Sequence, residues 1–168
     1  MIEYFKVGAN NEGKFIGKGY HIFKNGFIYY GNYQNDEYNG KGLLITSKKD
    51  MLYGYWKDGE CNGDGILKVK DQLTYEGKFE NNKKNGYGLE IYQNGSKYEG
   101  NFVDNKKCGK GKFYLGNGDV YEGNFENDLY NGKGVYIWGV DGREYCGNFR
   151  NGNMEGWGVN KFPDGSVY

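Results

Sequence analysis

The chain has 168 residues and is rich in glycine and aromatic residues, with 31 glycines, 18 tyrosines and 10 phenylalanines against a single proline. Its 22 basic and 22 acidic residues cancel, so no overall field favours nucleic acid or an anionic membrane, and any such binding has to be local. No apolar run approaches the ~20 residues that span a bilayer, and the N-terminus lacks a secretory pattern, so we expect a cytoplasmic protein.

Glycines recur with a period of 23 residues from the N-terminus onward. An opening series comprises Gly8, Gly31, Gly54, Gly77, Gly100 and Gly123, with Gly147 displaced by one residue. The first glycine of each Gly-x-Gly follows nine residues later, at Gly17, Gly40, Gly63, Gly86, Gly109, Gly132 and Gly156. This period predicts seven stacked copies that form one continuous array over residues 1–168.

The clearest copy is the segment 75–95, which reads YEGKFENNKKNGYGLEIYQNG. Its Tyr-Glu-Gly-x-Phe, Gly-x-Gly and Asn-Gly elements resemble the membrane occupation and recognition nexus (MORN) repeat. The first copy departs from that pattern at Lys6 and Asn10, and the third has Leu52 in place of tyrosine. The resemblance implies a rod-like, twisted antiparallel sheet with an aromatic-lined groove, and a role in cytoskeletal, ciliary or membrane-proximal assemblies.

Asn-Gly between apolar runs is a strong signal for a β-hairpin. It occurs at Asn25-Gly26, Asn94-Gly95 and Asn117-Gly118, and Asp-Gly at Asp141-Gly142 and Asp164-Gly165. The extra residue before Asp141 predicts a bulge or a longer turn. Two strands per repeat therefore predict an all-β fold: an elongated single-layer antiparallel meander that curls into a groove.

Side-chain facing follows from the assumed turn lengths. A two-residue turn at Asn94-Gly95 places Ile91 opposite Tyr98, and a five-residue loop over 81–85 places Phe79 opposite Tyr87. One face would then carry Tyr75, Gly77, Phe79, Tyr87, Leu89, Ile91, Tyr98, Gly100 and Phe102, and the other Glu76, Lys78, Glu80, Glu90 and Glu99. Each opening glycine would lie across from an aliphatic residue and make room for neighbouring rings.

The aromatic rows are the best candidate for a binding site. A contiguous apolar groove is typical of a partner surface, although the same rings are also needed to hold the sheet together. The predicted groove comprises Tyr29, Tyr33, Trp56, Tyr75, Phe79, Tyr98, Phe102, Tyr121, Phe125, Tyr145 and Phe149. We expect it to bind an extended or helical segment of a partner protein.

Catalytic, metal and cofactor sites are not predicted. The single histidine, His21, occupies a phase held elsewhere by Leu44, Leu67, Phe113 or Tyr136, which favours a surface or edge-strand residue over a catalytic one. The row of Glu76, Glu99 and Glu122 has like environments, whereas acid–base pairs need unlike ones. Gly86-Tyr87-Gly88 lacks the rest of a nucleotide-binding fingerprint. Three cysteines that do not align between copies, Cys61, Cys108 and Cys146, indicate free thiols.

Two lysine pairs, Lys83-Lys84 and Lys106-Lys107, share one loop phase in adjacent copies and could meet an anionic lipid headgroup. Other copies lack them, so solubilising loops are favoured over this phosphoinositide-binding alternative. A third reading is the repeat region of a larger enzyme, since similar arrays accompany lipid kinases and protein methyltransferases. Tyr168 falls 23 residues after Tyr145 and would open an eighth copy, which suggests a truncated array or an end-to-end dimer.

Overall fold

The computed structural model describes residues 4–6 and 12–168. The chain divides into two compact units, Met1–Lys83 and Lys84–Tyr168. The first holds β1 (Tyr4–Lys6), β2 (Gly17–Ile22), β3 (Ile28–Gln34), β4 (Glu37–Ile45), β5 (Met51–Lys57), β6 (Glu60–Val69) and β7 (Leu73–Glu80). The second holds β8 (Lys83–Tyr92), β9 (Lys97–Val103), β10 (Lys106–Tyr114), β11 (Val120–Glu126), β12 (Leu129–Ile137), β13 (Glu144–Arg150) and β14 (Asn153–Lys161). Strand β8 begins at Lys83, the last residue of the first unit.

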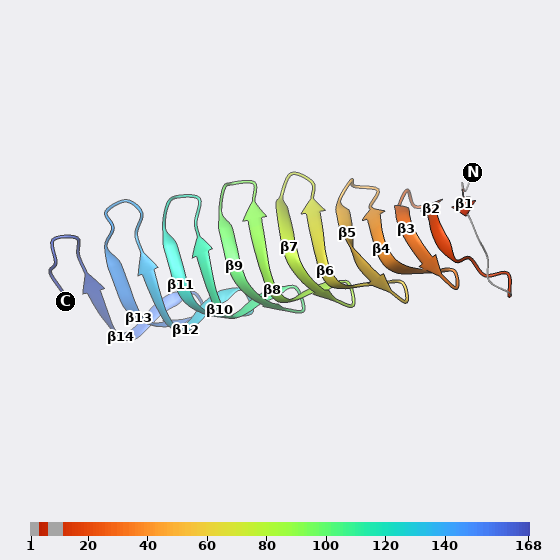
Figure 1. Ribbon diagram of the computed structural model, residues 1–168. Helices are drawn as coiled ribbons and strands as arrows, with labels where there is room; N and C mark the ends of the chain where they lie inside the picture. Colours follow the sequence, from red (N-terminus) through yellow and green to blue (C-terminus); the bar gives the residue numbers. More distant parts are fainter. Residues whose placement is uncertain (1–3, 7–11) are drawn as a thin grey trace. The chain divides into compact units, whose positions relative to one another are not determined.

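Within each unit, every strand pairs antiparallel with the strand that follows it in the chain (Figure 1). The predicted all-β meander with two strands per repeat is therefore confirmed. No helix occurs among residues 4–6 and 12–168, and so none that could span a bilayer. Gly8 and Asn10, in the degenerate first copy, lie outside the described residues.

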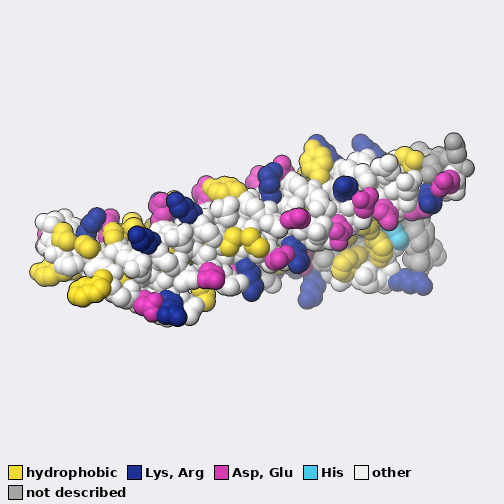
Figure 2. All heavy atoms as spheres, turned by 90° about the horizontal axis from the view of Figure 1, so that it is seen from below, with side chains coloured by type: hydrophobic (Ala, Val, Ile, Leu, Met, Phe, Trp, Pro, Cys, Tyr) yellow, Lys and Arg dark blue, Asp and Glu magenta, His cyan; other side chains and the backbone are white. Residues whose placement is uncertain are grey.

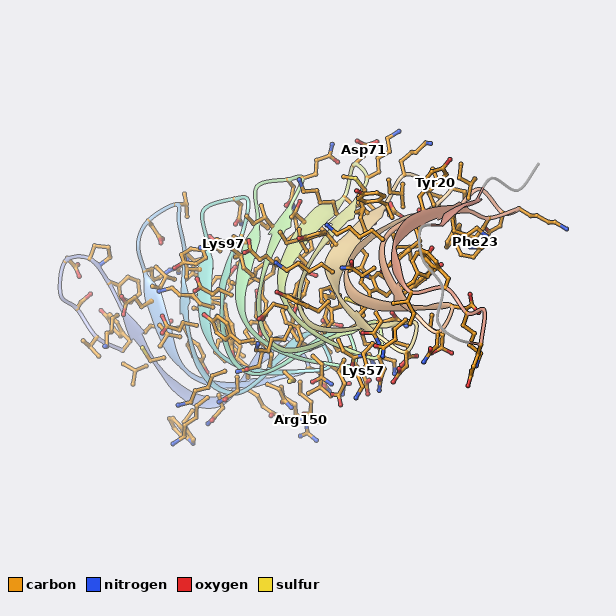
Figure 3. All side chains as sticks on the ribbon, turned by 45° about the vertical axis from the view of Figure 1, so that its right-hand side comes forward. Tyr20, Phe23, Lys57, Asp71, Lys97 and Arg150 are labelled. Carbon is orange, nitrogen blue, oxygen red and sulfur yellow. The ribbon has the colours of Figure 1, made fainter. Side chains whose placement is uncertain are left out.

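Two kinds of turn alternate along the chain, and the sequence analysis assigned them wrongly. The polar run after each closing aromatic residue is a two-residue turn in which both residues have positive φ, as at Asp104 (48°) and Asn105 (72°). Asn81 and Asn82 have the same backbone (49° and 65°), and β8 already begins at Lys83. The expected five-residue loop over 81–85 is therefore wrong. Lys57 in Figure 3 marks an edge with such a turn, and Asp71 marks the other edge.

The Asn-Gly sites form three-residue loops instead. The amide of Gly95 donates to the carbonyl of Tyr92 at 3.0 Å, and the amide of Tyr92 donates to the carbonyl of Ser96 at 2.9 Å. Gly95 takes the left-handed conformation (φ 83°) that closes a three-residue hairpin loop. The longer turn expected around Asp141-Gly142 is confirmed, because the amide of Trp138 pairs with the carbonyl of Arg143.

The extra loop residue shifts the register by one and reverses the faces of β8. Glu90 lies opposite Tyr98, and Ile91 lies opposite Lys97. Tyr87 and Ile91, expected among the aromatic rings, are 56% and 46% exposed on the other side of the sheet, whereas Glu90 is only 1% exposed. A slip of one residue moves every side chain of a strand to the other face. The face that carries the opening tyrosines is called the aromatic face below, and the other is called the opposite face.

The glycines make room for tyrosine rings, as expected, but by a different pairing. Gly100 lies opposite Gly88 and Gly111, and not opposite an aliphatic residue. The hydroxyl of Tyr98 donates to the carbonyl of Asn101 at 3.0 Å, so the ring folds over the paired glycines. A Cβ atom on Gly111 would lie 2.5 Å from that hydroxyl oxygen. The same tyrosine-to-carbonyl bond recurs in four other repeats.

Side chains in the two-residue turns connect consecutive repeats. The carboxamide of Asn82 accepts from the amide of Cys61 at 2.8 Å, while the amide of Asn82 donates to the carbonyl of Cys61 at 3.0 Å. Asn105 with Lys84 and Asp128 with Lys107 form the same reciprocal pair. Backbone groups at the edge of these hairpins are thus satisfied by the turn of the next.

Candidate binding face

The predicted groove residues form the core of each unit. All eleven are 0–6% exposed. Their rings pack edge to face between repeats, as Tyr98 does with Phe125 (centroids 4.9 Å apart) and Tyr121 does with Phe149 (4.9 Å). A partner on the aromatic face would therefore rest mainly on the side chains that border these rings.

Those bordering side chains come from the second strand of each repeat, and they differ between copies. One row follows the two-residue turn and contains Phe15, Tyr38, Cys61, Lys84, Lys107, Tyr130 and Met154. A second row lies along the same strands and contains His21, Leu44, Leu67, Glu90, Phe113, Tyr136 and Asn160. A third row lies at or just beyond the strand ends and contains Phe23, Thr46, Val69, Tyr92, Leu115, Trp138 and Phe162. Five of these first-row residues lie opposite a closing aromatic residue, as Tyr130 lies opposite Phe125; the other four are Tyr38, Cys61, Lys107 and Met154.

In the second unit, an apolar cavity of about 470 Å³ opens on the aromatic face. It lies where β12 and its neighbouring strands contribute Leu115, Tyr130, Tyr136, Trp138, Phe149 and Met154. Tyr130 stacks on the core ring of Tyr121 with centroids 3.8 Å apart. The cavity combines aromatic walls with hydroxyl and indole groups, which is typical of sites that bind peptide side chains.

Asp119 fixes one wall of this cavity. Its carboxylate is 8% exposed, accepts from the amide of Gly139 at 2.8 Å and also accepts from the hydroxyl of Tyr136. The hydrogen bond from Tyr136, followed by that from Gly139, lowers the pKa of Asp119. Burial and the contact with Asp119 raise the pKa of Tyr136. Both groups therefore keep their protonation states near neutral pH, and the position of the Tyr136 ring is fixed.

The first unit has a cavity of its own, of about 530 Å³, lined in part by His21, Phe23, Tyr33 and Tyr38. His21 stacks on Phe23 with ring centroids 3.8 Å apart. In Figure 2, hydrophobic side chains gather next to the chain's one histidine. This cavity also receives Asp36 and Glu37 and is therefore more acidic than that of the second unit.

A buried ionic cluster occupies the aromatic face near β8 and β10. Glu90 contacts the ammonium groups of Lys84 and Lys107, the latter at 3.1 Å, and accepts a hydrogen bond from Tyr92. The side chains of the two lysines are only 13% and 12% exposed. Burial acts to raise the pKa of Glu90, but the hydrogen bonds from Lys84 and Tyr92 and the charge of Lys107 outweigh it, so the pKa is lowered. Glu90 is therefore ionised at neutral pH.

Lys107 fills the place that tyrosine takes in the repeat of β12. Its ammonium lies 5.2 Å from the ring centroid of Tyr98 and 5.3 Å from that of Tyr92, and donates to the hydroxyl of Tyr92 at 2.6 Å. Aromatic faces attract such a cation. The core thus accepts either a ring or a lysine in this row, provided that a carboxylate accompanies the lysine.

The candidate lipid-binding lysines divide into two kinds. Lys83 and Lys106 are exposed at the starts of β8 and β10. Lys84 and Lys107, by contrast, point onto the aromatic face and contact Glu90. The predicted placement of Glu90 on the mostly polar opposite face was wrong, and the same register error explains why the cluster was missed. Tyr136 and Trp138 were missed as cavity residues because their two rows were never assigned to the aromatic face.

Other reactive groups are sparse. Among residues 12–168 the side chains of His, Cys, Asp and Glu form no group of three or more that could hold a metal ion. Cys61, Cys108 and Cys146 are free thiols. Cys61 is fully buried, and burial raises the pKa of its thiol to about 11.

Comparison with known proteins agrees with this architecture. A family model described as MORN repeat matches residues 29–51, 53–70, 75–97, 98–120, 121–143 and 145–167. Six repeats are therefore matched, and the degenerate first copy of the seven expected is not among them. No curated protein sequence matches the chain significantly.

Two solved structures with very different sequences share the fold. One is the TCP domain of SAS-4 (dCPAP) of Drosophila melanogaster, in complex with a proline-rich motif of Ana2 (dSTIL): it is 12% identical, with 98% of this chain and 88% of that chain covered and a TM-score of 0.55. The other is the G-box domain of the microcephaly protein CPAP, at 11% identity, with 99% and 90% covered and a TM-score of 0.54. At such identities the likeness concerns the fold alone.

Proposed function

Because the chain belongs to the MORN-repeat family, we propose that it is a non-catalytic scaffold whose aromatic face binds an extended segment of a partner protein. The cavity of the second unit carries this proposal. Its walls combine aromatic rings with the flexible side chain of Met154, a mixture suited to holding apolar peptide side chains. The core rings beneath, such as Phe149, act mainly as its floor.

The chemistry of the cavity favours a segment that contains proline or aromatic residues. Extended proline-rich peptides dock on aromatic-lined grooves because they lose little conformational entropy on binding. The SAS-4 domain, which shares this fold, was solved with a proline-rich motif bound, and we extend that kind of ligand to this chain. A role in a cytoskeletal or ciliary assembly belongs to the same proposal, as does a cytoplasmic location.

The lipid-binding alternative has less support. Only Lys83 and Lys106 of the four candidate lysines are exposed, because Lys84 and Lys107 pair with Glu90. Each exposed basic residue contributes about 1 kcal/mol at an anionic surface, so two give weak attraction. Flotation with acidic vesicles tests this alternative: binding that survives Lys83→Glu with Lys106→Glu would refute lysine-mediated recognition.

The proposal can be tested by selecting binders from a random 12-residue peptide library with the intact chain. We expect the selected peptides to be enriched in proline and aromatic residues and to bind at least 10-fold more weakly to Trp138→Ala. Trp157→Ala is the matched control, because Trp157 is 95% exposed on the opposite face. Equal retention of the selected peptides by both variants would refute binding at this cavity.

A further inference from the structure

The opposite face of the first unit carries two adjacent rows of apolar side chains. The first row consists of directly paired residues on β2 to β6: Tyr20, Tyr30, Leu43, Tyr53 and Ile66. The second row, two residues further along the strands, consists of Ile22, Ile28, Ile45 and Met51. Together these residues form the apolar strip; Tyr20, at one end, is labelled in Figure 3.

Two side chains of the apolar strip are exposed and the other seven are half-buried. Tyr30 is 59% exposed and Tyr53 is 47% exposed, and no second layer of strands or helices covers them among the described residues. A contiguous, partly exposed apolar surface with no covering layer is typical of an interaction site.

In the second unit, four of the nine equivalent positions are charged and five are apolar; the charged ones are Lys97, Glu99, Lys112 and Glu122. Lys112 and Glu122 occupy the positions of Leu43 and Tyr53 three repeats later, since 112−43 and 122−53 both equal 69, or three periods of 23. They form an ion pair of 2.9 Å on the same face. Because charged side chains occupy four of these positions in the second unit, the fold does not require Ile28, Tyr30, Leu43 and Tyr53 to be apolar, and a ligand explains these four side chains better.

Basic residues border the apolar strip on both long sides. Lys18 and Lys41 lie next to the first row, and Lys24, Lys48 and Lys49 lie in the turns beyond the second; all five are exposed. In the described part of the chain, no carboxylate lies within 4.0 Å of these five ammonium groups. Asp36, Glu37, Asp58 and Glu60 lie at the edge with two-residue turns. Three carboxylates lie closer to the strip: Asp64 pairs with Lys78 at 2.8 Å, Asp50 accepts from the amide of Lys70, and Glu76 lies opposite Ile66.

The dimensions and charges together define the ligand. Five strands spaced by ~4.8 Å make the strip about 20 Å long, which is the length of a helix of about 13 residues. Two rows of side chains match the apolar stripe of an amphipathic helix. We infer that the apolar strip docks an amphipathic helix of a partner protein, with carboxylates along both edges of its apolar stripe.

The probe is a fluorescein-labelled 16-residue helical peptide with leucine at helical spacing and glutamate at the flanking positions, titrated with the intact chain and followed by anisotropy. The test variant is Leu43→Lys with Tyr53→Glu, which copies the ion pair of Lys112 and Glu122 and should leave the thermal melt unchanged. We expect it to weaken binding at least 10-fold, and Lys41→Gln with Lys48→Gln to weaken it several-fold.

Trp138→Ala serves as the control and separates this proposal from the proposed function, because the cavity of the second unit should not affect the helix. A matched peptide with lysine in place of glutamate should bind at least 10-fold more weakly. Absence of binding by the glutamate peptide, or equal binding by the folded double variant, would overturn the inference. The inference would also be overturned if the chain forms a homodimer that the double variant abolishes, or if the chain binds acidic vesicles more tightly than the peptide.

Discussion

Removal of the carboxylate at Glu90 should destabilise the second unit strongly. Glu90→Gln keeps the shape of the side chain but leaves the ammonium groups of Lys84 and Lys107 without a counter-charge. Breaking a buried ion pair in this way costs about 3–5 kcal/mol. The lysine side chains retain 13% and 12% exposure, through which water can reach them, so we expect the lower limit of about 3 kcal/mol.

A loss of this size lowers the melting temperature by roughly 6–12 °C for a chain of this length. Thermal melts followed by circular dichroism at pH 7 measure it. A matched variant combines Glu90→Leu, Lys84→Met and Lys107→Tyr, which are residue types found in the same rows at Leu44, Met154 and Tyr130. Its free energy of unfolding should lie within about 1 kcal/mol of that of the parent, because apolar replacement of a whole buried ionic group is often neutral.

The pH dependence provides a second readout. The pKa of Glu90 is lowered in the folded chain, so its ionised form stabilises the fold above the ordinary glutamate pKa of about 4.3. That contribution is lost as the pH falls through the lowered value. The parent should therefore lose more stability than Glu90→Gln between about pH 5 and pH 3. Equal melting of the parent and Glu90→Gln at pH 7 would refute the reasoning.

Three further predictions concern the repeat itself. Gly111→Ala should lower the free energy of unfolding by about 2 kcal/mol or more, because the added Cβ would lie 2.5 Å from the hydroxyl of Tyr98. Gly95→Ala should cost only about 1 kcal/mol, because its Cβ would meet no atom within 4 Å and only the positive φ of 83° is unfavourable. Similar urea midpoints for the two variants would contradict this. Asn82→Gly keeps the turn but removes the acceptor for the amide of Cys61, so it should lower the free energy of unfolding in urea by about 1 kcal/mol. An unchanged free energy of unfolding would show that this hydrogen bond between repeats does not stabilise the fold. At pH 8 the Cys61 thiol, with its pKa raised to about 11, should be alkylated at least about 100-fold more slowly in the folded chain than in urea; rapid labelling identified by mass spectrometry would contradict its burial.

The repeat period and the turn residues predict much of the fold. The 23-residue spacing places two strands in each copy, and asparagines and glycines mark most of the turns, the exceptions being those at 46–50 and 70–72. Turn length was the weak step, because Asn-Gly closes both two-residue and three-residue loops, and only the hydrogen bonds of Tyr92 and Gly95 distinguish them. One extra residue in the loop was enough to reverse the faces of β8.

The sequence contained a signal that would have corrected this error. Leu44, Leu67 and Phe113 occupy the phase of Glu90, and an apolar row at that phase indicates the buried face. Read in this way, Glu90 is a carboxylate among buried side chains, and Lys107 is its natural partner. The cavity around Trp138 depends on the sizes of neighbouring side chains in three dimensions, which spacing alone does not provide.

Acrylamide quenching of tryptophan fluorescence tests binding on the aromatic face most directly. In a Trp157→Phe variant two indoles remain: Trp56, which is 4% exposed, and Trp138 at the cavity. A saturating selected peptide should lower the quenching constant at least twofold, because it covers the accessible ring. A constant that stays unchanged while the peptide is bound would show that the partner lies elsewhere, and would contradict the proposed function.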